Sequence, residues 1–167
     1  MRTPTSPDKV GMDILGGVFQ GSMTVAVPPN HGQGAKRMKY GNTVRLDTGF
    51  EETLSRVRAV FKEQGFGILT EIDVKATLKE KINVDVDAYV ILGACNPVLA
   101  NRALAIEPQI GLLLPCNIVV RKSDGHTLVH AVDPAMLVTI TGLPELQEVA
   151  DEAENRIAAA LTALAAK

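Results

Sequence analysis

The sequence has few aromatic residues, little cysteine and no long apolar run. Aromatic residues make up 4% of the 167 positions and Trp is absent, so Val, Ile, Leu and Ala must build the core. No segment reaches the roughly 18 uninterrupted apolar residues that a membrane-spanning helix needs. Residues 1–10 hold two prolines and an acid in place of the apolar stretch of a secretory signal. We therefore expect no membrane partner.

The chain also lacks an excess of charge of either sign. Its formal net charge is −2, and no basic stripe with interleaved aromatics occurs, so we expect no nucleic-acid binding. Its two cysteines, Cys95 and Cys116, both lie next to apolar segments. Neither belongs to a close ligand pair, so no metal site is predicted. This cysteine usage fits a reducing compartment, and we predict a cytoplasmic protein.

Two parts of the chain differ in composition. Residues 1–40 contain Pro4, Pro7 and the pair Pro28–Pro29, a Gly-rich stretch at 30–34 and a basic patch at 36–39. We predict that they form an N-terminal arm, with one short strand over 23–27, that packs on the domain or on a second subunit. Residues 41–167 carry regular hydrophobic periodicities and are predicted to form a single domain.

The order of these periodicities sets the expected fold class. Strands are predicted at 42–46, 66–72, 88–92, 116–121 and 127–132, with a tight turn at 123–125. Helices are predicted after Asp47 or Thr48, after Asp73, from Pro97 with Asn96 as the cap, and from about Pro144. This order indicates an α/β domain, with α+β as the alternative, in which helices pack on a mixed sheet in two layers. The strand order stays open.

Cys95 is the strongest candidate for a functional residue. It follows the apolar strand at 88–92 and precedes Asn96 and the helix that begins at Pro97. Free amides at a helix start stabilise a thiolate and lower its pKa. The competing interpretation is that Cys95 packs as a small hydrophobic residue. If the strands at 88–94 and 116–121 are neighbours, Cys116 shares a cleft with Cys95.

Polar residues near the predicted strand ends complete the candidate site. Glu71 is a candidate general base, and with Cys95 it forms the candidate catalytic set. Asp73, Asn96, Asn117 and the thiol of Cys116 are candidate ligand-binding groups. The structural alternative is that Asp73 and Asn96 cap helices and that Glu71 is solvated. His130 lies in a predicted strand, where a surface or half-buried side chain is the more common role.

Several segments together resemble the domain of unknown function 302 family. They are Gly65–Val74, Lys79–Lys81, Tyr89–Pro97, Ala103–Leu104, Ile110–Asn117 and Val132–Pro134. The resemblance covers about residues 41–165, and it departs from the family pattern at Val98, where many members carry a second proline. It implies a compact single-domain α/β fold, often found as a homodimer, in a family without an established general activity.

Three functions are compatible with these patterns. The leading hypothesis is a dimeric small-ligand-binding or accessory domain with a pocket around Cys95, Asn96, Glu71 and Cys116. The second is a thiol-dependent enzyme in which Cys95 is the nucleophile or the redox centre. The third is a structural interaction protein that uses residues 1–40 to hold its partner. No cofactor is assigned.

Overall fold

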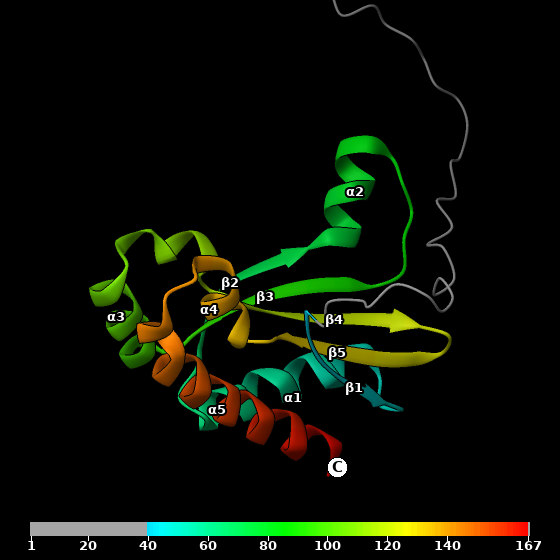
Figure 1. Ribbon diagram of the computed structural model, residues 1–167. Helices are drawn as coiled ribbons and strands as arrows, with labels where there is room; N and C mark the ends of the chain where they lie inside the picture. Colours follow the sequence, from blue (N-terminus) through cyan, green and yellow to red (C-terminus); the bar gives the residue numbers. More distant parts are fainter. Residues whose placement is uncertain (1–39, 167) are drawn as a thin grey trace, which may run out of the picture.

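The fold is one five-stranded sheet with helices packed against it (Figure 1). The computed structural model describes residues 40–166. The strands lie in the order β1-β5-β4-β3-β2. They are β1 (Gly41–Leu46), β2 (Gly67–Asp73), β3 (Tyr89–Cys95), β4 (Cys116–Ser123) and β5 (His126–Val132). The predicted class, helices packed on a sheet, is confirmed.

The pairing of the strands differs from the prediction in one respect. All four neighbouring pairs are antiparallel, so the sheet is antiparallel throughout rather than mixed. A parallel pair requires a crossover connection that carries the chain back to the starting edge. Here the segments after β2 and β3 return the chain in the opposite direction beside the strand just completed. Helical periodicity between two strands does not distinguish these connections.

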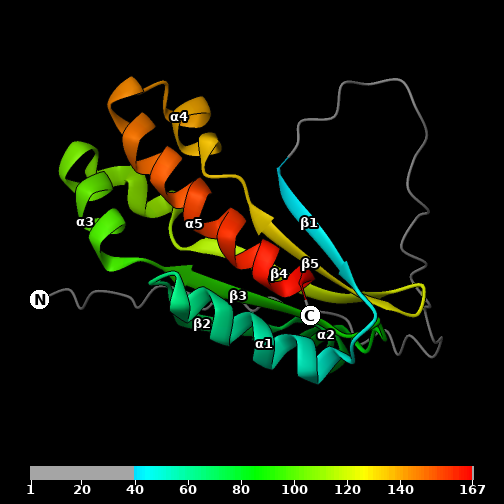
Figure 2. The same cartoon turned by 90° about the horizontal axis from the view of Figure 1, so that it is seen from below.

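The main core lies between the sheet and the helices α1 (Phe50–Glu63) and α5 (Gln147–Ala165). Figure 2 shows both helices lying across the same face of the sheet. Strands with one buried face alternate inward and outward residues, and β5 follows this pattern with Thr127, Val129 and Ala131 buried. From the helix side, α1 contributes Phe61, which is fully buried.

A second apolar cluster closes one end of the sheet. It is formed by α3 (Pro97–Ile106), the 3-10 helix η1 (Pro108–Leu113), α4 (Ala135–Thr141), the 3-10 helix η2 (Pro144–Leu146) and the start of α5. Leu146 is fully buried in this cluster, and burial of a Leu side chain contributes roughly 1.5–3 kcal/mol. The cluster therefore fixes α3 and α4 beside the end of β3 and the start of β4.

The start of α2 and the turn between β4 and β5 agree with the sequence prediction. Asp73 caps α2 (Val74–Ile82), because its carboxylate accepts the Ala76 N–H at 2.8 Å. The turn after β4 contains Asp124 and Gly125, both with positive φ, as a tight hairpin requires.

The predicted cap of α1 is wrong. Gly49 is the N-cap residue, and no side chain caps this helix. The two predicted capping residues have other partners. The Asp47 carboxylate bonds His126 Nδ1 at 2.8 Å, and the Thr48 hydroxyl bonds the Thr53 hydroxyl at 2.7 Å. A side chain of β5 therefore binds Asp47, and a side chain of α1 binds Thr48. Neither residue is left to cap the helix, as the local capping rule predicts.

The predicted strand at 23–27, and all of the predicted arm except residue 40, lie outside the described residues. Within residues 40–166, no helix combines the length and the apolar character needed to cross a bilayer.

Candidate functional site

Cys95 occupies the position that the sequence predicted. It is the last residue of β3, and the next residue, Asn96, is the N-cap of α3. Pro97 occupies the first helical turn, where its missing N–H costs nothing. The Asn96 side chain accepts hydrogen bonds from the backbone N–H groups of Val98 and Leu99 at 3.1 and 3.2 Å.

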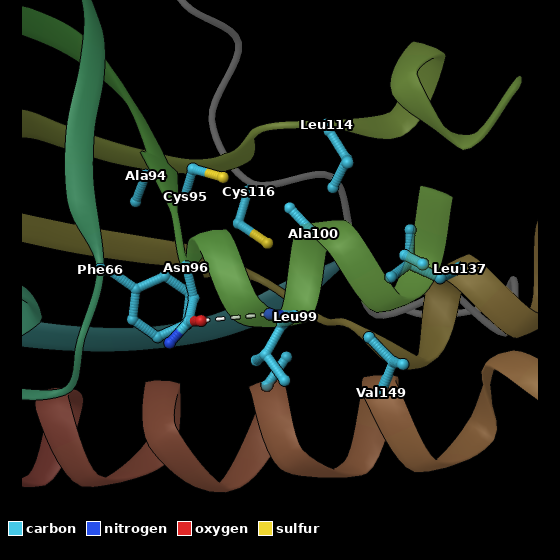
Figure 3. Close-up of a pocket in the computed structure, with 12 residues that line it drawn as sticks. Phe66, Ala94, Cys95, Asn96, Leu99, Ala100, Leu114, Cys116, Leu137 and Val149 are labelled. Atoms are coloured by element: carbon cyan, nitrogen blue, oxygen red, sulfur yellow. Dashed lines mark hydrogen bonds between the residues drawn. The ribbon is translucent and has the colours of Figure 1, made fainter. Parts of the chain in front are cut away.

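The fold brings the two thiols to one small cavity, which we call the thiol cavity. β3 and β4 are neighbours, and Ala94 pairs with Cys116 in their register, so Cys95 follows the residue that is paired with Cys116. Figure 3 shows the Cys116 sulfur directed toward α3, whereas the Cys95 side chain leaves its strand on the side opposite Ala94. The cavity holds about 20 Å³, enough for about one water molecule.

The wall of the thiol cavity is almost wholly apolar. Besides the two cysteines and Asn96, it is lined by Phe66, Ala94, Leu99, Ala100, Ala103, Leu114, Leu137, Val149 and Ala153. Both thiols are free. Cys95 and Cys116 therefore both line this cavity, which at about 20 Å³ is too small to admit an organic ligand.

The surroundings of the two thiols favour their protonated forms. Burial raises the pKa of the Cys95 thiol. Burial, followed by the neighbouring Cys95, raises the pKa of Cys116 from 9.0 to about 11. The amides at the start of α3, which the sequence analysis assigned to a thiolate, instead donate to the Asn96 side chain. The start of α3 therefore stabilises a Cys95 thiolate less than the sequence alone indicates.

Glu71 and Asp73 do not join the thiol cavity. The Glu71 carboxylate pairs with the Arg58 guanidinium of α1 at 2.5 Å, and both side chains are more than one third exposed (45% and 38%). Glu71 lies opposite Leu92 in the register of β2 and β3, and Leu92 belongs to the main core face. Asp73 is occupied as the cap of α2. The structure thus separates these two carboxylates from the cysteines.

A larger cavity, which we call the corner cavity, lies between the η1–β4 corner and α4. It holds about 270 Å³. Its apolar wall consists of Leu112, Leu113, Leu114, Pro115, Val132, Pro134, Met136, Leu137 and Ile140. The remaining lining residues are Cys116, Asn117 and Asp133. Cys116 therefore lines both cavities, and Asn117, predicted to bind a ligand, lies in the corner cavity rather than beside Cys95.

Asp133 is a candidate that sequence reasoning missed. One of its carboxylate oxygens accepts the Ala135 N–H at 3.0 Å at the start of α4, and its backbone N–H donates to the Tyr40 carbonyl at 2.9 Å. The sequence marked Asp133 and Pro134 as a turn. Only the tertiary structure shows that Asp133 also lines a cavity.

His130 lies outside both cavities and is half-buried, as the sequence analysis favoured. It bonds the Thr43 hydroxyl through Nδ1 at 2.8 Å, and its Nε2 accepts the Arg121 Nε–H at 3.1 Å. Since Arg121 can only donate, Nδ1 carries the ring proton. Burial, with a smaller effect from the Arg121 charge, lowers the pKa of His130. Among residues 40–166, no three His, Cys, Asp or Glu side chains are grouped to hold a metal ion.

Comparison with known proteins places this geometry in a family. The model of the domain of unknown function DUF302 matches residues 42–164. The chain belongs to the DUF302 family. An uncharacterised conserved DUF302 protein from Bacillus stearothermophilus has a similar crystal structure, with 37% sequence identity and a TM-score of 0.70. The similarity covers 75% of this chain and 98% of that one. No curated protein matches the sequence.

Proposed function

We propose that this DUF302 protein is a small-ligand-binding domain whose ligand occupies the corner cavity beside Cys116. The observation that carries the proposal is the volume of that cavity together with its lining. An apolar cavity of about 150 Å³ already admits benzene, and the corner cavity holds about 270 Å³. It has room for a small ring with short substituents. The thiol cavity, at about 20 Å³, does not.

The lining of the corner cavity supports a particular ligand chemistry. Apolar side chains cover most of the wall, as in small-molecule sites generally, and few polar groups fix the orientation. One carboxylate oxygen of Asp133 accepts a hydrogen bond from the Ala135 N–H. Within residues 40–166, the other carboxylate oxygen has no hydrogen-bond partner. The proposed ligand therefore has an apolar body and one amine or hydroxyl group directed at Asp133 and Asn117.

Two further features belong to the proposal. The free thiols fit a reducing compartment, so we place the domain in the cytoplasm. The homodimer follows from the family resemblance. Compared with ligand binding, a thiol-dependent enzyme has less support, because burial raises the pKa of both Cys95 and Cys116.

The test uses benzylamine and benzyl alcohol, which share a ring and differ in charge. Ligand-observed NMR on the full chain measures binding of each probe. We expect both to bind, and benzylamine to bind more tightly because Asp133 attracts its ammonium group. Asp133→Asn keeps an oxygen for the Ala135 N–H and removes the charge, so it is expected to abolish the preference for benzylamine.

A matched pair of variants locates the binding. Ile140 lines the corner cavity and is 55% exposed, whereas Ile82 lies on α2, away from that cavity, and is 63% exposed. We expect Ile140→Trp to fill the cavity mouth and prevent binding of both probes, and Ile82→Trp to leave binding unchanged. Absence of binding to the parent chain, or equal binding by these two variants, contradicts the proposal.

A further inference from the structure

The sheet has a second face, which we call the outer face, turned away from α1 and α5. Successive side chains of a strand point to opposite faces, and residues paired across two strands point to the same one. Because Val129 of β5 lies in the main core, Leu128 points to the outer face. Leu128 pairs with Arg45 of β1 on one side and with Arg121 of β4 on the other. By the same alternation, the outer face also carries Thr43, Val119, His126 and His130.

Each of the two arginines is positioned by a neutral histidine. Arg121 Nε–H donates to His130 Nε2 at 3.1 Å, and the Arg45 guanidinium bonds His126 Nε2. Since an arginine only donates, each Nε2 accepts and carries no proton. The other ring nitrogen of each histidine, Nδ1, bonds an oxygen atom of the chain at 2.8 Å. The two histidines lie four residues apart on β5, on either side of Leu128, so their rings are about 13 Å apart along the strand.

The positive charge of these two arginines is not balanced within the described part of the chain. Among residues 40–166, no ion pair includes Arg45 or Arg121. The neutral histidines accept hydrogen bonds without adding negative charge. Residues 1–39 hold more Lys and Arg than Asp and contain no Glu, so they do not complement this surface. The charge of the outer face therefore favours an acidic group supplied by another molecule.

We propose that the outer face binds an extended, acidic segment of a partner protein, with an apolar residue midway between two acidic residues that lie four positions apart. Side chains two positions apart in an extended segment point to one side, and those four positions apart are separated by about 13 Å, as on β5 itself. One acidic side chain of such a segment reaches Arg45, the other reaches Arg121, and the apolar side chain between them packs on Leu128. This surface is separate from the proposed ligand site, because none of these three residues lines the corner cavity.

The chemistry of the outer face favours carboxylates in this arrangement. A guanidinium group binds a carboxylate through charge-assisted hydrogen bonds, and its planar fork loses little freedom when it is already held in place. His126 and His130 hold the two guanidinium groups in the free protein. Leu128 is half-buried and offers an apolar contact between the two charges. Two ion pairs and one apolar contact at a surface give weak binding that decreases as salt is added.

The experiment is an NMR titration of the isotope-labelled full-length protein with short capped peptides. The test peptide contains Glu-Thr-Leu-Thr-Glu, and the uncharged control contains Gln-Thr-Leu-Thr-Gln. A reordered control, Thr-Glu-Leu-Glu-Thr, keeps the composition and the charge but places both Glu side chains on the side opposite Leu. We expect the test peptide to shift the backbone amide signals of β1, β4 and β5, and to bind at least about fivefold more tightly than either control.

Matched variants locate the contacts. Arg45→Gln and Arg121→Gln should each weaken binding of the test peptide by about three- to fivefold. Arg58→Gln removes the same charge from α1, on the opposite face of the sheet, and should leave the affinity unchanged. Equal binding of the test and reordered peptides to the parent protein, a comparison that needs no variant, overturns the proposal. So does a parent protein without shifts in these strands, or a loss of affinity in Arg58→Gln as large as in the other two variants. None of these results bears on probe binding in the corner cavity.

Discussion

The reactivity of the two thiols distinguishes a buried pair from an activated nucleophile. The perturbation is exposure of the reduced protein to 4,4′-dithiodipyridine, which reacts with thiolates by disulfide exchange. We expect Cys116 to react more slowly in the folded protein than in urea, because burial raises its pKa to about 11. Cys95 should also be slowed, since burial raises its pKa. The shift is large only at Cys116, so Cys95 should react first.

The size of the effect for Cys116 follows from its pKa. At pH 8, a shift from 9.0 to about 11 reduces the thiolate fraction by about 100-fold. A thiolate of higher pKa is intrinsically more nucleophilic, with a Brønsted slope of about 0.4–0.5. A rise of two pKa units therefore increases the rate constant of the thiolate itself by about tenfold. The net expectation is a rate about tenfold lower than in urea, before any steric shielding by the cavity wall.

The assay follows release of the coloured thione from pH 7 to 10, with peptide mass spectrometry to resolve the two cysteines. The urea-denatured chain supplies the reference rate for each thiol. The reasoning is refuted if Cys95 reacts faster in the folded protein than in urea, with an apparent pKa below the ordinary value of about 8.5. That result would favour the thiol-dependent enzyme.

Two further predictions concern stability. Asn96→Ala leaves two N–H groups at the start of α3 without their acceptor. It should lower the free energy of unfolding, measured by urea titration, by about 1–2 kcal/mol. Asn101→Ala, at an exposed position of the same helix, is the control, and an equal loss in both variants contradicts the capping role. The folded-state pKa of His130 lies below its ordinary 6.5, so the unfolded chain takes up a proton first as the pH falls. The stability contributed by neutral His130 is therefore complete above about 6.5 and declines as the pH falls toward the folded-state pKa. His130→Gln should flatten this part of the pH–stability profile, and an unchanged slope would refute it.

Features set by neighbouring residues were predictable from the sequence. Asn96 followed by Pro97 predicts the start of α3, and that start fixes Cys95 at the end of β3. Asp73 is a cap because its carboxylate reaches an amide three residues ahead. The Asp124–Gly125 pair predicts the hairpin, since both residues adopt positive φ. Each of these depends on local geometry and needs no knowledge of the rest of the chain.

The pairing of distant segments was not predictable in the same way. Hydrophobic periodicity predicts which face of a strand is buried, but it does not say which strand lies beside it. For this reason the mixed sheet was expected, and Glu71 was grouped with Cys95. In the structure, Glu71 belongs to the side of β2 that meets Arg58 of α1. The predicted cap of α1 failed likewise, because His126 of β5 takes the Asp47 carboxylate.

The sequence by itself determined the class of the fold, the position of Cys95 between a strand and a helix, and the caps of α2 and α3. The tertiary structure alone decided that Cys95 and Cys116 line one cavity of about 20 Å³ and that a larger one of about 270 Å³ opens beside Asp133. The physical reason is the range of the interactions. Caps and turns are closed by hydrogen bonds within a few residues, whereas a cavity is the space left when elements far apart in the chain pack together.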